Sequence, residues 1–148
     1  MNLLTASFVL SCLLMIMAIM AKPSFAISKG YAPFSEWKVT VINQLSPGQT
    51  LFLRCKSKDD DLGDHILQVG QSFSWEFRVN FFATTLFWCN MRTTSNKHVA
   101  MEVFWPESQD WLGYRCDYGL CNWSAKDNGI YLENIPKKSM EFVRSWEN

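Results

Sequence analysis

Apolar and polar residues alternate along much of the chain from Trp37 onward. The clearest example is the stretch from Ser72 to Phe81, in which every second side chain is apolar. A period of two places successive side chains on opposite faces of a β-strand, whereas a helix repeats every 3.6 residues. We therefore predict a strand over residues 72–81. The side chains expected to face inward are Phe73, Trp75, Phe77, Val79 and Phe81.

Shorter runs of the same alternation predict further strands, separated by turn residues. Ser46-Pro47-Gly48 is a turn signal, and Asp127-Asn128-Gly129 between two short apolar runs is typical of a hairpin. No stretch after residue 26 has a persuasive helical period, and residues 137–146 fit either a last strand or a short helix. These further strands are expected around residues 37–41, 51–55, 84–89, 99–105, 114–116, 121–123 and 130–132.

Many short strands between turn residues indicate an all-β sandwich or barrel. We predict an all-β fold, a disulfide-braced antiparallel β-sandwich of about seven to eight strands. Trp37, Trp75, Trp105 and Trp123 each lie on an apolar strand face and are expected in its core.

The first segment has the pattern of a secretory signal. Leu3 to Ala21 carries no charge, and Ser24-Phe25-Ala26 places small residues at positions −3 and −1 of a cleavage site. We expect residues 1–26 to be cleaved, 27–36 to form an irregular lead-in and 37–148 to form the domain. A retained membrane anchor is the alternative, because the apolar run approaches the ~20 residues that span a bilayer.

Removal of the leader takes away Cys12 and leaves an even number of cysteines, which in a short exported domain usually form two disulfides. A zinc site is the competing interpretation, but the cysteines form no Cys-x-x-Cys pair, and His65 and His98 are not at ligand spacing. The remaining cysteines are Cys55, Cys89, Cys116 and Cys121.

Strand alternation places Cys55 and Cys121 on inward faces. We favour the pairs Cys55–Cys121 and Cys89–Cys116, with a disulfide crossing the core, although spacing alone leaves all three pairings open.

Composition and charge narrow the classes of function. The 148 residues are 48% hydrophobic, which is typical of a folded protein, and 14 basic residues balance 14 acidic ones. With a net charge of zero, the protein lacks the excess of basic residues that is typical of a nucleic-acid-binding protein or of a cationic membrane-active peptide. No motif calls for a cofactor, a metal or a catalytic residue.

Several motifs together resemble one known family. They are Leu51–Gly63 (LFLRCKSKDDDLG), Phe73–Phe77 (FSWEF), Thr84–Cys89 (TTLFWC) and Cys121-Asn122-Trp123, with four cysteines in order. On these residues the chain resembles the plant self-incompatibility protein homologues, from about Trp37 to Tyr131.

The resemblance implies a secreted β-sandwich without catalytic machinery. Some members are similar to stigma determinants that act as ligands for a pollen receptor. We therefore expect a secreted, ligand-like signalling protein that acts in reproduction, development or defence through a plasma-membrane receptor, without stable membrane insertion after cleavage. Family membership alone does not fix this function.

Three polar loops are the expected recognition regions, since binding residues concentrate in exposed loops. For the first loop, a solvated turn or a weak Ca²⁺ site are the alternatives, although the ligand order of an EF-hand is missing. The expected recognition residues are Lys56, Lys58, Asp59, Asp60, Asp61 and Asp64 in the first loop, Arg92, Asn96 and Lys97 in the second, and Glu107 and Asp110 in the third.

Other candidate chemistry is weaker. Asn122-Trp123-Ser124 is the one N-glycosylation sequon, and its Asn is expected to face solvent. A cell-wall lectin would use Trp88 or Trp111 as an exposed sugar platform. A secreted hydrolase would need a carboxylate pair such as Glu76 and Glu102, but both are expected on solvated faces.

Overall fold

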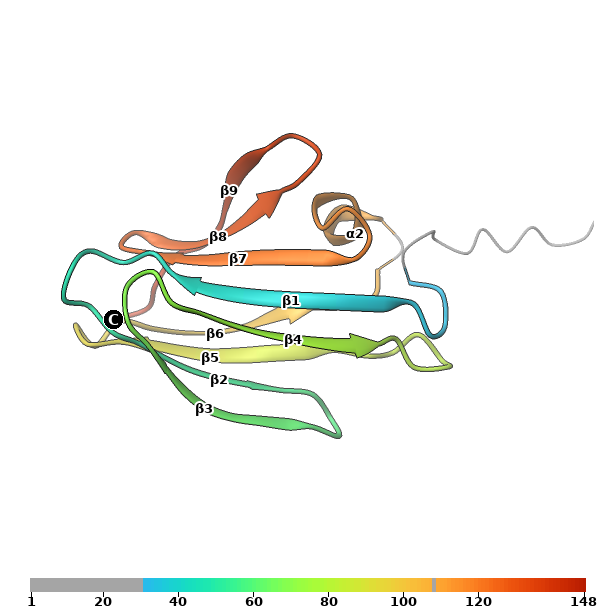
Figure 1. Ribbon diagram of the computed structural model, residues 1–148, viewed down its shortest axis with the longest axis horizontal. Coiled ribbons are helices and arrows are strands. Elements are labelled where there is room, and N and C mark those ends of the chain that lie inside the picture. The colour runs from blue at the N-terminus through green and yellow to red at the C-terminus, as the bar shows by residue number, and fades with distance from the viewer. Residues whose placement is uncertain (1–30, 108) are drawn as a thin grey trace, which may run out of the picture.

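The computed structural model describes residues 31–107 and 109–148, which contain nine strands and one short helix. The strands stack as two sheets, with the helix at one end (Figure 1). The elements are β1 (Glu36–Asn43), β2 (Leu51–Lys56), β3 (Asp61–Leu67), β4 (Ser72–Arg78), β5 (Phe87–Thr93), β6 (His98–Phe104), α2 (Trp111–Arg115), β7 (Leu120–Lys126), β8 (Gly129–Asn134) and β9 (Ser139–Arg144).

The larger sheet has the strand order β4-β1-β7-β8-β9, and the smaller sheet has the order β3-β2-β5-β6. Neighbouring strands run antiparallel except β1 and β7, which pair in parallel from Lys38–Leu120 to Asn43–Ala125. The chain visits the smaller sheet between these two strands, so no tight hairpin forces them to be antiparallel. The predicted β-sandwich is confirmed, with nine strands and one parallel pair.

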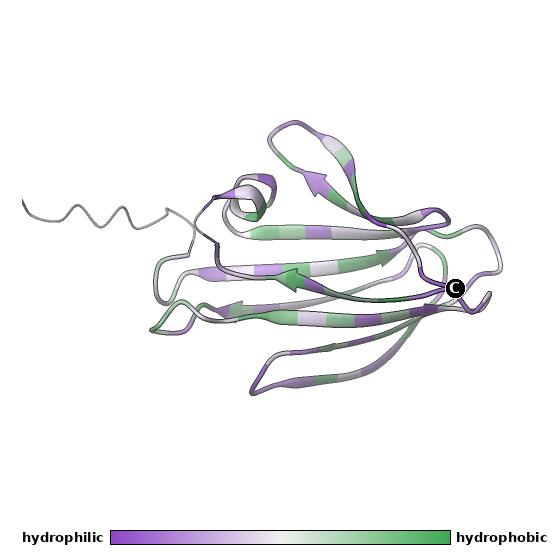
Figure 2. Cartoon of the chain, turned by 180° about the vertical axis from the view of Figure 1, so that it is seen from behind, coloured by the Kyte–Doolittle hydropathy of each residue, from purple (hydrophilic) through white to green (hydrophobic). Residues whose placement is uncertain are grey.

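The core lies where the inward faces of both sheets meet. Strand β1 alternates buried and partly exposed positions, and Trp37, Val39 and Val41 are buried. Trp123 reaches across the core, where its Nε1 donates a hydrogen bond to the backbone carbonyl of Val103 in the other sheet at 3.0 Å. Hydrophobic and hydrophilic segments alternate along the strands in Figure 2.

The predicted strand over residues 72–81 is too long, because β4 ends at Arg78. Val79 is buried as expected, but Phe81 belongs to a turn and is 65% exposed. The reason is local. Asn80 uses its side chain to close this turn, with Oδ1 accepting from the Thr84 backbone N–H at 2.8 Å, and Ala83 adopts a left-handed conformation.

The strand predicted around Tyr114 and Cys116 is wrong, because these residues belong to α2 and the turn after it. Leu112 and Cys116 are both buried at a spacing of four, and the Cys116 N–H donates to the Leu112 carbonyl at 2.9 Å. Tyr114 is exposed. One helical turn is too short to show a period in the sequence.

The first predicted loop is shorter than residues 56–64. It spans 57–60, and Asp61 to Leu67 form strand β3. β3 lies at the edge of its sheet, and of its residues only Leu67 is buried, so the sequence has no apolar alternation there. For residues 137–146 the strand interpretation is right, since β9 covers Ser139–Arg144.

The predicted disulfide pairing is wrong. Cys55 pairs with Cys89, and Cys116 pairs with Cys121. All four side chains are buried, but Cys55 and Cys89 are neighbours in one sheet, with Cα atoms 4.1 Å apart. The register places Cys55 directly opposite Cys89 on the neighbouring strand, so the two sulfurs meet within the smaller sheet and not across the core.

The strand connections gather at two opposite ends of the sandwich (Figure 1). Residues 31–35, the loop 57–60 and the loop 79–86 lie at one end, and the turns 94–97 and 127–128 lie at the other. Among the described residues, no helix is both long and apolar enough to cross a membrane.

Candidate functional site

Three phenylalanines project from the end formed by residues 31–35 and 79–86. Phe34, Phe81 and Phe82 are 61%, 65% and 79% exposed. Ring centroids are 6.3 Å apart for Phe34 and Phe81 and 5.3 Å apart for Phe81 and Phe82. We call these three residues the phenylalanine tip. Exposed aromatic side chains in one group typically mark a surface that another molecule covers.

Backbone bonds hold the phenylalanine tip in place. The Phe34 N–H donates to the Val79 carbonyl at 2.8 Å, and the Val79 N–H donates to the Ser35 carbonyl at 3.0 Å. The Asn80 N–H donates to Thr85 Oγ1 at 2.9 Å. These hydrogen bonds fix the backbone on both sides of the turn, so the aromatic rings are held in place in the free protein.

A charged loop lies beside the tip. Ser57 closes it, because its Oγ accepts from the Asp60 N–H at 3.0 Å while its own N–H donates to the Asp60 carbonyl at 2.8 Å. Lys58 and Asp59 at its apex are exposed. The Ser57 hydrogen bonds are those of a solvated turn, and the exposed charges are those of a recognition loop. The solvated-turn and recognition-loop interpretations are therefore compatible.

The charged loop and the loop 79–86 enclose a cleft of about 460 Å³, the end cleft. Phe82 from the phenylalanine tip lines it, and so does Trp88. Lys58, Asp59 and Asp60 line it as well, so the structure brings three of the predicted recognition residues to the same cleft as Phe82 of the phenylalanine tip.

The other residues predicted in the first loop are strand residues held in ion pairs. Arg54 Nη2 lies 2.6 Å from Asp61 Oδ2, and Lys56 Nζ lies 3.2 Å from the same oxygen. Asp64 lies 3.7 Å from Arg54. Hydrogen bonds from Arg54 and from the Gly63 N–H hold the pKa of Asp61 well below its usual range.

Glu107 and Asp110 bond within the protein. Glu107 accepts from the Leu112 N–H at the start of α2 and from Trp105 Nε1 at 3.2 Å. Asp110 accepts from the Tyr118 hydroxyl at 2.5 Å. Both carboxylates therefore stabilise the segment around α2 and are already engaged within the protein.

The second predicted loop lies at the opposite end of the sandwich. Lys97 Nζ donates to the Asp127 carbonyl at 2.9 Å, and Asn96 holds a left-handed turn. Arg92 belongs to β5 and lies over the Phe52 ring, with Cζ 4.6 Å from the centroid. The three predicted loops thus do not form one surface.

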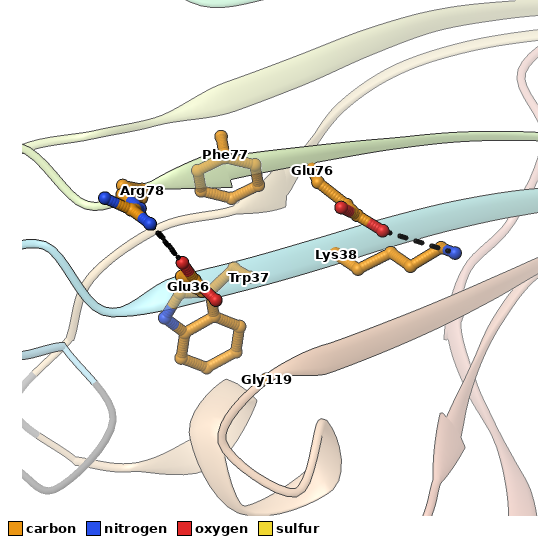
Figure 3. Close-up of a pocket in the computed structure, with 7 residues that line it drawn as sticks. All are labelled: Glu36, Trp37, Lys38, Glu76, Phe77, Arg78 and Gly119. Carbon is orange, nitrogen blue, oxygen red and sulfur yellow. Dashed lines mark hydrogen bonds and ion pairs between the residues drawn. The ribbon is translucent and has the colours of Figure 1, made fainter.

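Another pocket lies over the outer faces of β1 and β4 (Figure 3). Two ion pairs line it: Lys38 Nζ lies 3.6 Å from Glu76 Oε1, and Arg78 Nε donates to Glu36 Oε1 at 3.0 Å. Each charge already faces a partner of opposite sign. This pocket therefore offers less to a ligand than the end cleft.

Comparison with known proteins identifies the family. Residues 38–146 match the family model of plant self-incompatibility protein S1. The chain belongs to this family. The resemblance found in the sequence is confirmed.

This S1 family protein is similar to several proteins of Arabidopsis thaliana. It is 44% identical to S-protein homolog 1 over 113 residues, which cover 76% of this chain and 73% of the relative. It is 48% identical to S-protein homolog 74 over 100 residues, covering 68% and 64% respectively.

A solved structure has the same fold. It represents SPH (Self-Incompatibility Protein Homologue) proteins, described as a widespread family of small, highly stable, secreted proteins from plants. The TM-score is 0.59 at 18% identity, with 78% of this chain and 97% of the other covered. The S1 family is thus one of secreted plant proteins, and it is not an enzyme family.

The S1 fold separates the two carboxylates that a hydrolase would need, and it engages one of the two tryptophans that a lectin would use. Glu76 lies on β4 of the larger sheet and Glu102 on β6 of the smaller sheet, so they cannot flank one bond. Trp111 stacks on Trp105 and carries Arg115 over its ring at 4.1 Å. Trp88 is half-buried and lines the end cleft.

The described part of this S1 family chain has no cluster of three or more residues that could hold a metal ion. Asn122 of the sequon is half-buried, and its Nδ2 donates to Glu133 Oε2 at 2.7 Å. The predicted signal segment, residues 1–26, lies outside the described residues, as do residues 27–30 of the lead-in.

Sequence reasoning missed the phenylalanine tip. Phe81 continues the period of the preceding strand, which concealed the turn. The signal available was Asn80, a turn residue, followed by two bulky apolar residues and then Ala83-Thr84-Thr85, since a strand that alternates cleanly does not place Phe81 and Phe82 together.

Proposed function

We propose that this protein is a secreted signalling ligand of plants that binds a plasma-membrane receptor through the phenylalanine tip and the charged loop 57–60. It serves reproduction, development or defence. Residues 1–26 direct the protein into the secretory pathway as a signal peptide and are then removed. The proposal includes no catalytic step.

The exposure of three adjacent phenylalanines supports the proposal most directly. Protein interfaces combine a few aromatic anchors with a polar rim, and the anchors contribute most of the binding free energy. The phenylalanine tip supplies the anchors, and Lys58, Asp59 and Asp60 supply a rim whose charges fix orientation and partner choice. A turn closed by its own hydrogen bonds loses little conformational entropy on binding.

Binding of labelled mature protein to plant plasma-membrane vesicles tests the proposal. Phe82→Ser should weaken binding at least tenfold without lowering the unfolding temperature, because the side chain is exposed in the free protein. Phe142→Ser is the matched control, since Phe142 is 55% exposed on β9, at the opposite edge of the larger sheet from β4. Its binding should equal that of the wild type.

Protease-treated vesicles and protein-free liposomes complete the design. Binding should be lost on both, because the proposed partner is a protein. Equal binding of wild type to liposomes, or full binding by Phe82→Ser, would refute the receptor proposal. Lys58→Glu should also weaken binding, and a loss that appears only together with reduced stability would count against a direct contact.

A carbohydrate-binding function is the second candidate, carried by Trp88. This ring lines the end cleft together with Asp59 and Thr84, whose oxygens are the kind that bind sugar hydroxyl groups. A glycan array decides between the two functions. A lectin should bind a defined glycan and lose it on Trp88→Ala, whereas a receptor ligand should bind none.

A further inference from the structure

A third concave site lies on the outer face of the smaller sheet, in the middle of its strands. It is a groove of about 610 Å³ that crosses all four strands, β3, β2, β5 and β6. One wall is a row of side chains directly opposite one another in the register, namely Ile66, Phe52, Arg92 and His98. We call this site the sheet groove.

The next row forms the floor and closes one side of the sheet groove. Asn90 on β5 and Ala100 on β6 are opposite each other and are short, so they leave the space above them open. Arg54 and Asp64, in the same row, form an ion pair toward β3.

The two arginines of the sheet groove differ in what they can bind. Arg54 donates from Nε and Nη2 to the carboxylate of Asp61, at 3.3 and 2.6 Å. The guanidinium of Arg92 lies over the Phe52 ring, and among the described residues no carboxylate is paired with it. Stacking on an aromatic face leaves the N–H groups at the edge of a guanidinium available to a planar anion.

On the other side of Arg92, His98 lies 3.7 Å from the Glu147 carboxylate. The remaining two members of the row are apolar. Ile66 is 62% exposed beside Phe52, which is half-buried. An exposed β-branched side chain next to an aromatic ring gives a ligand apolar area to cover. Asp64 on the β3 side, 77% exposed as a side chain, disfavours a second negative charge there.

We propose that the sheet groove binds a small amphipathic carboxylic acid, with one carboxylate on Arg92 and an apolar ring or chain against Phe52 and Ile66. A single unpaired cation selects for one anionic group, and the apolar neighbours select for the body of the ligand. The site is separate from the end cleft, so this inference stands or falls independently of receptor binding.

Three probes with one apolar body test the inference: phenylbutyrate, phenylbutanol and phenylbutylamine, titrated into the isotope-labelled mature protein by NMR. Phenylbutyrate should shift the amide signals of β2, β5 and β6 around the groove. The alcohol should bind roughly tenfold more weakly, a difference of about 1.4 kcal/mol, and the amine more weakly still. Equal binding of all three would overturn the proposal.

Arg92→Gln should reduce phenylbutyrate affinity to that of the alcohol. Lys126→Gln is its matched control, because Lys126 also lies over an aromatic ring, Tyr131, but in the other sheet. Ala100→Phe fills the floor without changing any charge and should abolish binding of every probe. Unchanged phenylbutyrate affinity in Arg92→Gln, or in a folded Ala100→Phe, would refute the site. So would amide signal shifts that occur only outside the groove.

Discussion

Cys55 and Cys89 lie directly opposite each other on β2 and β5, and their disulfide closes within a single sheet. The 4.1 Å between their Cα atoms matches the close spacing of a pair that does not exchange backbone hydrogen bonds. The bond therefore connects two central strands of the smaller sheet. The two sheets are held together by side-chain packing and by the hydrogen bond from Trp123 to Val103.

The two disulfides should contribute unequally to stability. Cys55–Cys89 closes a separation of 34 residues and Cys116–Cys121 one of 5. Chain entropy gives about 4 kcal/mol for the first loop and about 2 kcal/mol for the second. Urea unfolding of Cys55→Ala/Cys89→Ala and Cys116→Ala/Cys121→Ala should show this order. A larger loss from the second pair would show that local packing around α2 dominates.

Strands with one buried face could be predicted from sequence, and the edge strand could not. In β1 and β2 every second residue enters the core, so hydrophobicity reports the structure. β3 buries only Leu67, and its backbone pairs with β2 without apolar alternation. The charged sequence of β3 therefore resembles that of a loop, because backbone hydrogen bonds between strands do not depend on the polarity of the side chains.

The candidate site was predictable only in part. Lys58, Asp59 and Asp60 are polar residues between strands, which is the sequence signature of an exposed loop. Phe82 is apolar, and a pattern argument places apolar residues inside. Its exposure follows from the turn closed by Asn80 and Thr84, and thus from tertiary geometry. The disulfide pairing likewise depends on which strands are neighbours, which spacing does not encode.

Gly129, the first residue of β8, should tolerate no side chain. Its φ is +150°, and an added Cβ would meet the Arg144 carbonyl and approach the Phe142 ring at 2.7 Å. Gly129→Ala should destabilise the fold by roughly 2–5 kcal/mol, from backbone strain plus overpacking. Gly48 has a φ of +83° with nothing within 4 Å of such an atom. Gly48→Ala should cost only about 1–2 kcal/mol.

Thermal and urea unfolding of both glycine variants checks this difference. Similar losses at the two positions would mean that β9 shifts away from Gly129 easily, so that the contact with Arg144 imposes no real constraint.

Glu141 should make stability depend on pH. Its carboxylate accepts from Asn134 Nδ2 at 2.8 Å and from Arg115 Nε at 2.6 Å, and these bonds lower its pKa. A lowered pKa in the folded state means that the stabilisation is present above the unfolded value of about 4.3 and is lost as the pH falls through the folded value.

Urea unfolding at about pH 6 and about pH 3 measures this contribution. The wild type should exceed Glu141→Gln in free energy of unfolding at the higher pH, and the difference should shrink at the lower one. Glu102→Gln on the outer face of β6 controls for a general charge effect. A difference that is the same at both pH values would place the role of Glu141 in packing.

Asn122 should carry a glycan when the protein is made in plant cells. Its Nδ2 is bonded to Glu133 across β7 and β8, and Ser124 is 4% exposed, so the folded domain hides the sequon. Modification must therefore occur before these strands pair, while the chain enters the secretory pathway.

The secreted protein should lose mass on endoglycosidase treatment and begin at Ile27, whereas the mass of Asn122→Gln and of Ser124→Ala should not change on this treatment. Ser124→Thr preserves the sequon, so this variant should keep the glycan. A wild-type mass equal to that of Asn122→Gln would mean that folding of this hairpin outpaces glycan transfer.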